Sequence, residues 1–272
     1  MLIFFAFSAE VSRATRCSPN SIAVPAPREV MTLPSVTMRS SARMAGNSAP
    51  AVIVTAGGTP VKLEVPGEIE YAGKGVSYCA ICDGAFYRGH TIMVVGGGDA
   101  ALEEADFLTR YAEKVYIVHR RDAFRASKIV QQRAFANPKI EVIRDTVVNE
   151  IHGASGLMTH ARITNTKTGV ASDLIATGIF IFIGFTPNTG IIKEHVEHDA
   201  TGYLITDTNM RTSVPGLYAA GDVRAQLTRQ VTTAVGDATT AAIAVEKFLT
   251  ARKNGQLAPA PMPMLIPAVT TG

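Results

Sequence analysis

Residues 91–101 read Thr-Ile-Met-Val-Val-Gly-Gly-Gly-Asp-Ala-Ala, and this stretch decides the fold. An apolar strand runs into three glycines, and apolar side chains then recur at helical spacing. Gly96 permits a tight turn, Gly98 lets the backbone approach a pyrophosphate, and Ala101 allows close packing of helix on strand. The alternative is a glycine-rich turn without a ligand. In this setting the pattern predicts a dinucleotide-binding turn, with binding residues Gly96, Gly97, Gly98, Asp99 and Ala101.

The segments around this turn alternate between strand and helix. A second helix is expected over residues 123–135, so residues 91–143 predict a parallel sheet with right-handed crossovers. Residues 147–174 change to short antiparallel strands, a β-meander, and residues 232–249 form an Ala-rich helix. The expected strands of the α/β part cover residues 51–55, 91–95, 114–118, 140–143, 178–183, 202–205 and 216–220. The fold class is therefore α/β, with a Rossmann-like domain that carries a β-meander.

The end of the second strand indicates which nicotinamide binds. An NAD site places an acidic residue there, but this chain has His119, Arg120 and Arg121, with Arg125 one helical turn further. Guanidinium groups match a phosphate in fork geometry. The four residues predict a site for the 2′-phosphate of NADPH. A solvated basic turn is the alternative.

Cys79 and Cys82 are three residues apart, a spacing that brings two sulfurs close enough to bond at a helix start. Asp83 follows directly, and a carboxyl group there can exchange protons with a thiol. The three residues predict a redox-active dithiol with its acid–base group. A zinc site would need a second ligand pair, which the chain does not offer, so no metal is expected. An inert buried pair is the other alternative.

Gly221 and Asp222 end another expected strand, and Arg229, Gln230 and Val231 precede the Ala-rich helix. Together they suggest a second nucleotide held at a helix N-terminus. A helix-capping aspartate is the plain alternative.

The chain has 272 residues, a net charge of +3 and three cysteines. This balance favours neither nucleic acid nor a membrane surface as partner, and the cysteine count is typical of a reducing compartment, so a cytoplasmic protein is expected. Residues 1–50 stay unassigned. Their composition resembles an organelle transit peptide weakly and a disordered or artefactual leader better. The proline-rich residues 251–272 are expected to be a disordered tail.

Several motifs in order carry a family resemblance between residues 51 and 249. They are Gly-Val-Ser-Tyr-Cys-Ala-Ile-Cys-Asp-Gly at 75–84, Val-Val-Gly-Gly-Gly-Asp at 94–99, His-Arg-Arg-Asp-Ala-Phe-Arg-Ala-Ser at 119–127, Gly-Phe-Thr-Pro-Asn-Thr at 184–189, Met-Arg-Thr-Ser-Val-Pro-Gly at 210–216, Ala-Ala-Gly-Asp-Val at 219–223 and Arg-Gln-Val at 229–231. With them the chain resembles bacterial-type low-molecular-weight thioredoxin reductases, a class of pyridine nucleotide-disulfide oxidoreductases.

The resemblance implies a homodimeric flavoprotein that passes electrons from NADPH through FAD to a disulfide and then to thioredoxin or a thioredoxin-like protein. Cys82 would face the flavin, Cys79 would attack the substrate disulfide, and Asp83 would be the acid–base group. Asp222 would contact the ribityl–phosphate region of FAD, with Gln230 and Val231 at the flavin ring. Residues 73–185 would form the NADPH domain, inserted in a partial Rossmann-like FAD domain of residues 51–72 and 186–250.

The sequence departs from the family pattern at three places. Residues 1–50 show no strand–GxGxxG–helix unit for the FAD pyrophosphate, Ala56 stands where Thr is usual, and Ala100 replaces a usual Ser or Thr. Two alternatives therefore remain beside a thioredoxin reductase. One is an NADPH-binding module without flavin or turnover, and the other is a reductase of another disulfide carrier such as a peroxiredoxin.

Overall fold

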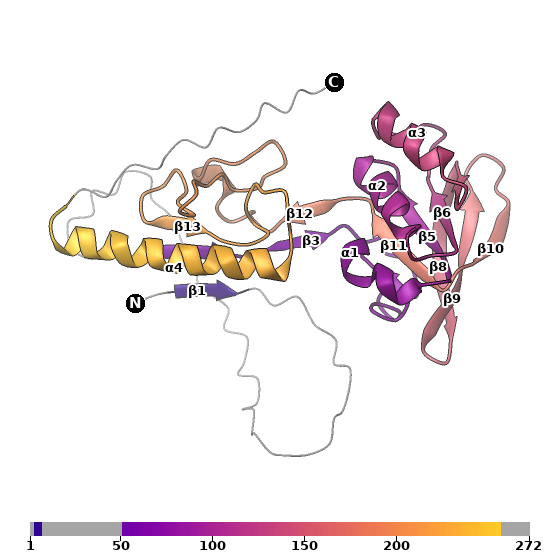
Figure 1. The fold of residues 1–272 in the computed structure, drawn as a ribbon, viewed down its shortest axis with the longest axis horizontal. Coiled ribbons are helices and arrows are strands. Elements are labelled where there is room, and N and C mark those ends of the chain that lie inside the picture. Colours follow the sequence, from indigo (N-terminus) through magenta and orange to yellow (C-terminus); the bar gives the residue numbers. More distant parts are fainter. Residues whose placement is uncertain (1–2, 7–50, 257–272) are drawn as a thin grey trace, which may run out of the picture. The chain divides into compact units, whose positions relative to one another are not determined.

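The computed structural model describes residues 3–6 and 51–256, which divide into two compact units (Figure 1). Unit 1 comprises Met1–Gly57 and Pro187–Gly272, and unit 2 comprises Gly58–Thr186. The chain crosses between them beside a two-stranded sheet of β3 (Gly58–Pro60) and β12 (Phe185–Pro187). Unit 1 is thus built from two segments of the chain, and unit 2 is the segment between them.

The first crossing lies earlier than the expected boundary at residue 73. Leu63 and Val65 pack against the core of unit 2, and the Pro66 carbonyl accepts the N–H of Ile151 at 2.9 Å. A side chain at Gly67 would collide with the Ile151 carbonyl, so this segment lies directly on the β-meander. These contacts explain why residues 58–72 belong with the cysteine-bearing unit.

Unit 2 contains a five-stranded parallel sheet with the order β4-β11-β5-β6-β7. Its strands are β4 (Val76–Ser77), β5 (Thr91–Gly96), β6 (Lys114–Val118), β7 (Ile140–Ile143) and β11 (Gly178–Phe182). The helices of this unit are the short α1 (Ala80–Asp83), followed by a 3-10 turn at Gly84–Tyr87, then α2 (Asp99–Leu108) and α3 (Lys128–Ala136). This is the Rossmann-like fold that the sequence predicts.

Alternation along β5 separates the two faces of this sheet. Ile92 and Val94 pack with the helices α2 and α3, whereas Met93 and Val95 pack with the meander. The meander is an antiparallel sheet of β8 (Thr146–Ala154), β9 (Leu157–Asn165) and β10 (Ala171–Ile175), with β9 in the middle. Helices therefore cover one face and the meander the other (Figure 1).

Unit 1 contains a smaller parallel sheet with the order β1-β2-β13. Its strands are β1 (Ile3–Ala6), β2 (Val52–Thr55) and β13 (Leu217–Ala219), and the long helix α4 covers Val231–Lys253. Ile53 and Tyr218 pack against Ala241, Val245 and Phe248 of this helix. A second cluster, around Leu204, covers Val54, Leu217 and Ala219. A short 3-10 turn, η2, lies at Lys193–His195.

Four expectations for individual segments need correction. Residues 3–6, expected within a disordered leader, form β1, and helix α4 continues to Lys253, past the expected start of the disordered tail at residue 251. Residues 202–205 form no strand, because Leu204 makes only isolated bridges to His198 and Arg224. The second helix begins at Lys128 and not at 123. The rest of the expected leader and of the tail beyond residue 256 lies outside the described residues.

Candidate functional site

Cys79 and Cys82 form a disulfide, with their Cα atoms 5.3 Å apart. Cys79 is the N-cap of α1, and its sulfur accepts the backbone N–H of Cys82 at 3.1 Å. Cys82 is exposed and Cys79 is half-buried. The predicted dithiol pairing is thus confirmed.

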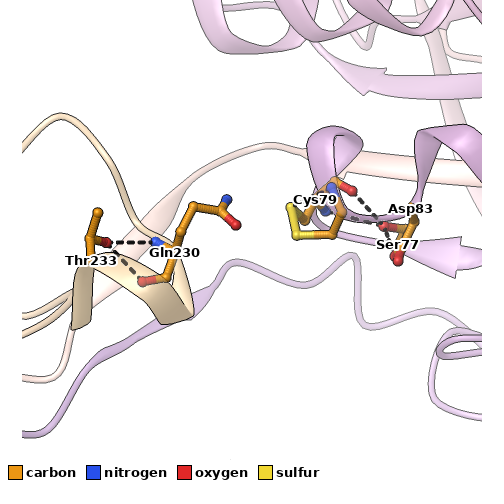
Figure 2. The surroundings of a disulfide bond; sticks show 6 residues. Ser77, Cys79, Asp83, Gln230 and Thr233 are labelled. Carbon is orange, nitrogen blue, oxygen red and sulfur yellow. Dashed lines mark hydrogen bonds between the residues drawn. A yellow bond between two sulfur atoms is a disulfide. The ribbon is translucent and has the colours of Figure 1, made fainter. Parts of the chain in front are cut away.

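Asp83 is linked to Cys79 through the hydroxyl of one serine (Figure 2). Ser77, which is 3% exposed at the end of β4, donates its hydroxyl to Asp83 Oδ2 at 2.6 Å and accepts the N–H of Cys79 at 3.1 Å. The Asp83 backbone N–H also reaches the Cys79 carbonyl at 3.2 Å. The carboxyl group is therefore fixed beside the disulfide. Sequence reasoning assigned no role to Ser77, whose only signal is its place two residues before Cys79.

A buried carboxylate holds the segment before the cysteines. Glu68, 1% exposed, accepts the Tyr78 hydroxyl at 2.6 Å and the backbone N–H groups of Leu63 and Glu64 at 3.0 and 2.7 Å. Burial, reinforced by the Glu68 bond, raises the pKa of Tyr78 above its usual range. Glu68 was missed from the sequence, because its partners surround it only after the chain has folded back.

The glycine turn has the shape that a dinucleotide site requires. A Cβ at Gly96, where φ is 156°, would lie 2.5 Å from the Phe182 carbonyl oxygen and 2.6 Å from the Cβ of Ala101. A Cβ at Gly97 would strike the His119 ring, whereas one at Gly98 would meet nothing within 4 Å. The open side at Gly98 precedes the first turn of α2, whose backbone N–H groups suit a pyrophosphate. The residues present therefore fit a dinucleotide.

Asp99 and the loop after β6 bind the glycine turn from the other side. The N–H groups of Arg125 and Ala126 both reach the Gly97 carbonyl, at 2.8 and 3.2 Å, and Asp99 Oδ1 accepts the N–H of Ser127 at 2.8 Å. These bonds hold residues 119–127 as a loop, which explains the late start of α3. Asp99 thus joins turn and loop, beyond the cofactor contact that the sequence predicted.

The basic residues of this loop differ in placement. His119 is buried and stacks on Phe124, with ring centroids 4.6 Å apart, and its Nε2 lies 3.0 Å from the Ala123 carbonyl. Arg120, Arg121 and Arg125 are exposed. Within residues 3–6 and 51–256, none of these three guanidinium groups makes an ion pair or side-chain hydrogen bond. His119 is therefore a wall of the turn, and the arginines provide unneutralised positive charge beside it.

Unit 1 has its own polar cluster at the end of β13. Gly221, at φ 79°, donates its N–H to Asp237 Oδ2 at 2.9 Å, and Arg224 pairs with the same oxygen at 2.7 Å. Burial raises the pKa of the neighbouring Asp222 carboxyl, while Arg229 opposes that rise. Arg224 and Asp237 were not anticipated from the sequence. Asp237 lies two turns inside α4, where nothing marks it as a partner of Gly221.

The N-terminus of α4 carries the remaining predicted residues. Gln230 is its N-cap and forms a capping box with Thr233, whose hydroxyl accepts the Gln230 N–H at 3.2 Å (Figure 2). The guanidinium of Arg229 lies 4.2 Å from the Tyr203 ring centroid, and Val231 is 80% exposed. Gly221, Asp222 and the start of α4 thus form one cluster within unit 1.

Within the described part of the chain, no group of three or more His, Cys, Asp or Glu side chains could hold a metal ion. No helix among these residues is both long and apolar enough to cross a membrane.

The sequence pattern of one protein family, described as pyridine nucleotide-disulphide oxidoreductase, matches residues 25–238. The chain belongs to this family. The match begins well before residue 51, where the sequence resemblance began, although residues 25–50 lie outside the described part.

Individual relatives in this family confirm the resemblance to thioredoxin reductases. A thioredoxin reductase of Peptoclostridium litorale is 46% identical over 207 residues, which cover 74% of this chain and 65% of the relative. The solved thioredoxin reductase of Streptococcus pyogenes is 50% identical with a TM-score of 0.72, and that of Giardia duodenalis is 41% identical with 0.69. Each of these two matches covers 74% of this chain and 66% of the solved one. The chain thus spans slightly less than two thirds of its relatives.

Proposed function

We propose that this chain is an NADPH-dependent flavoprotein disulfide reductase, which reduces thioredoxin or a thioredoxin-like protein. The observation that carries the proposal is the Cys79–Cys82 disulfide with Asp83 held beside it by Ser77. It lies in the same unit as a dinucleotide-shaped turn, in a chain of the pyridine nucleotide-disulphide oxidoreductase family. The homodimer that we also propose rests on the family resemblance alone, and the cytoplasmic location rests on the cysteine count and on that resemblance.

Unit 2 supports NADPH as the electron source. Gly98 leaves room for a pyrophosphate at the start of α2, and the backbone of Arg125 is bonded to the same turn. The guanidinium groups of Arg120, Arg121 and Arg125 would bind the 2′-phosphate, which NADH lacks. These side chains would orient the nucleotide and discriminate between the two nicotinamides.

Unit 1 supports a flavin nucleotide by the chemistry of its donors. The Asp222 carboxylate can accept hydroxyl groups of a ribityl chain, and the first turn of α4 offers backbone N–H groups beside Gln230 and Val231. The residues described thus fit the ribityl end of FAD. When bound, FAD would supply a two-electron carrier suited to hydride and disulfide chemistry.

The dithiol would act by exchange once two electrons and a proton have reduced the disulfide. The Cys79 thiolate attacks one sulfur of the partner's disulfide, forming a mixed disulfide and releasing the partner's other sulfur as a thiolate. The Cys82 thiolate then attacks Cys79, which re-forms the internal disulfide and releases the second partner thiolate. Asp83 would donate a proton to an outgoing thiolate and accept one from the attacking thiol. The Cys82 N–H at the Cys79 sulfur would stabilise the attacking thiolate.

One experiment tests the electron path. The full chain is purified with added FAD, its flavin absorbance is measured after desalting, and the reduction of a disulfide dye and of thioredoxin is followed with NADPH and with NADH. We expect retained flavin, a rate with NADPH well above that with NADH, and loss of reduction in the Cys82→Ser variant. Cys17→Ser, which also removes one thiol, should leave the rate unchanged.

The other results of this experiment would decide against the proposal. Colourless protein that binds NADPH without turnover would favour a nucleotide-binding module. A rate that survives Cys82→Ser would show that electrons do not pass through this disulfide. Reduction of a peroxiredoxin and not of thioredoxin would favour the other disulfide carrier.

A further inference from the structure

The turn between β9 and β10 contacts residues 119–127, the basic loop after β6, through Lys167. Its ammonium group lies 3.1 Å from Asp145 Oδ2 and 3.4 Å from Asp122 Oδ2. Asp145 follows β7, and Asp122 lies in the loop after β6, directly after Arg121. Lys167 on the meander therefore links the loop after β6 to the segment after β7. Both lie at the edge of the parallel sheet where the 2′-phosphate is expected.

Asp145 ties the same turn to the backbone of Arg121. It lies at φ 51°, in the left-handed region, and its N–H donates to the Arg121 carbonyl at 3.3 Å. Its own carbonyl accepts the N–H and the hydroxyl of Thr166 at 2.6 and 2.9 Å. The Asp145 side chain is 18% exposed, so its bond to Lys167 is better shielded from solvent than the bond of Asp122, whose side chain is 72% exposed. This arrangement fixes both the position of the loop and the direction of the Asp122 carboxylate.

The charge of Asp122 makes its position important. A carboxylate next to Arg121 can pair with a guanidinium that should bind phosphate, and it repels the phosphate directly. In the described structure Asp122 pairs with Lys167 and with neither Arg120 nor Arg121. The hydrogen bond from Lys167 holds the pKa of Asp122 below its ordinary value. The lysine thus neutralises the one acidic side chain that follows the two arginines.

We propose that Lys167 is a positioning residue for nicotinamide specificity, which holds Asp122 away from Arg120 and Arg121 and so keeps these arginines available for the 2′-phosphate. The inference rests on the proposed NADPH specificity. It assigns Lys167 no direct contact with the nucleotide.

The test measures binding of two fragments to the full chain by calorimetry, so it needs no flavin and no turnover. 2′,5′-ADP carries the extra phosphate and 5′-AMP lacks it. In the Lys167→Met variant we expect affinity for 2′,5′-ADP to fall by up to about fivefold, as the loss of an exposed ion-pair network allows, while 5′-AMP affinity stays the same. Lys167→Arg should retain the preference. Lys74→Met, which removes another exposed lysine of unit 2, should not change it.

A second variant separates positioning from direct binding. Because the freed Asp122 carboxylate causes the loss, Asp122→Asn in the Lys167→Met background should restore most of the affinity for 2′,5′-ADP. A loss that Asp122→Asn leaves unchanged would make Lys167 a direct phosphate ligand and overturn the inference. Equal losses for both fragments, or no loss, would also overturn it. A wild-type chain that binds both fragments alike would overturn the proposed NADPH specificity together with this inference.

Discussion

Two carboxylates, Asp83 in unit 2 and Asp237 in unit 1, are held in opposite ways. Asp83 accepts a neutral hydroxyl from Ser77 at 2.6 Å and lies beside a disulfide. Asp237 pairs with the buried guanidinium of Arg224 at 2.7 Å and also accepts the N–H of Gly221. Asp83 thus has a neutral partner, whereas losing either member of the Arg224–Asp237 pair would leave a buried charge without its partner. The contrast suggests that the first carboxyl serves chemistry and the second serves structure.

The largest effect should follow from Asp83→Asn, which keeps the shape and removes the acid–base group. Because a positioned proton donor contributes roughly 10²–10⁴-fold to a rate, we expect NADPH-driven disulfide reduction to fall at least about a hundredfold. Flavin content and thermal stability should stay close to wild type. Steady-state kinetics with a disulfide dye measures the first quantity, and absorbance and calorimetric melting measure the others.

Ser77→Ala is the matched variant for this region. It leaves the carboxyl group but removes the hydroxyl that orients it, so the rate should fall less and its pH profile should change. Asp122→Asn, at an exposed carboxyl of the same unit, should leave the rate of dye reduction near wild type at saturating NADPH. A rate unaffected by Asp83→Asn would show that Asp83 takes no part in the proton transfers. The contrast between a chemical Asp83 and a structural Asp237 would then fail.

Arg224→Met should produce the corresponding structural effect in unit 1. The side chains of Arg224 and Asp237 are 9% and 12% exposed, and removing one partner leaves the other charge buried. Such a loss costs about 3–5 kcal/mol of unfolding free energy. Urea denaturation measures it, and the double variant Arg224→Met with Asp237→Leu should regain much of the loss. Unfolding that is unchanged in the single variant would show that this pair does not stabilise unit 1.

The sequence predicted those parts of the site whose chemistry is local. The glycine turn, the disulfide pair and the basic loop each lie within a few consecutive residues, and the fold brings turn and loop together as the Rossmann-like pattern requires. The partners of these motifs come from elsewhere. Lys167 follows Asp122 by 45 residues and lies on the meander, which no local pattern connects to the loop.

The same limit explains the errors in segment boundaries. Residues 123–127 have a helical composition, but the stack of His119 on Phe124 and the bonds from Arg125 and Ala126 to Gly97 hold them as a loop. Tertiary contacts override local propensity there. The early crossing into unit 2 follows likewise from contacts of residues 63–67 with the meander.

The smallest effect that we predict concerns Asp222, which lies between the two kinds of carboxylate. Burial raises its pKa above the ordinary 3.8, so the folded chain binds this proton more tightly than the unfolded chain does. The stability that Asp222 contributes is therefore fully present below pH 3.8 and is lost as the pH rises through its raised pKa. Asp222→Asn removes the ionisation, so the variant should gain a small amount of stability relative to wild type as the pH rises above 3.8.

Urea denaturation of both proteins across this pH range measures the difference, in which the titrations of all other groups cancel. The same variant should retain less flavin after desalting, because a carboxamide accepts fewer hydrogen bonds from ribityl hydroxyls than a carboxylate does. Greater stability together with weaker flavin retention would place Asp222 with Asp83, as a group kept for function at a cost in stability. A variant that is less stable at neutral pH would instead place it with Asp237, as part of the structure of unit 1.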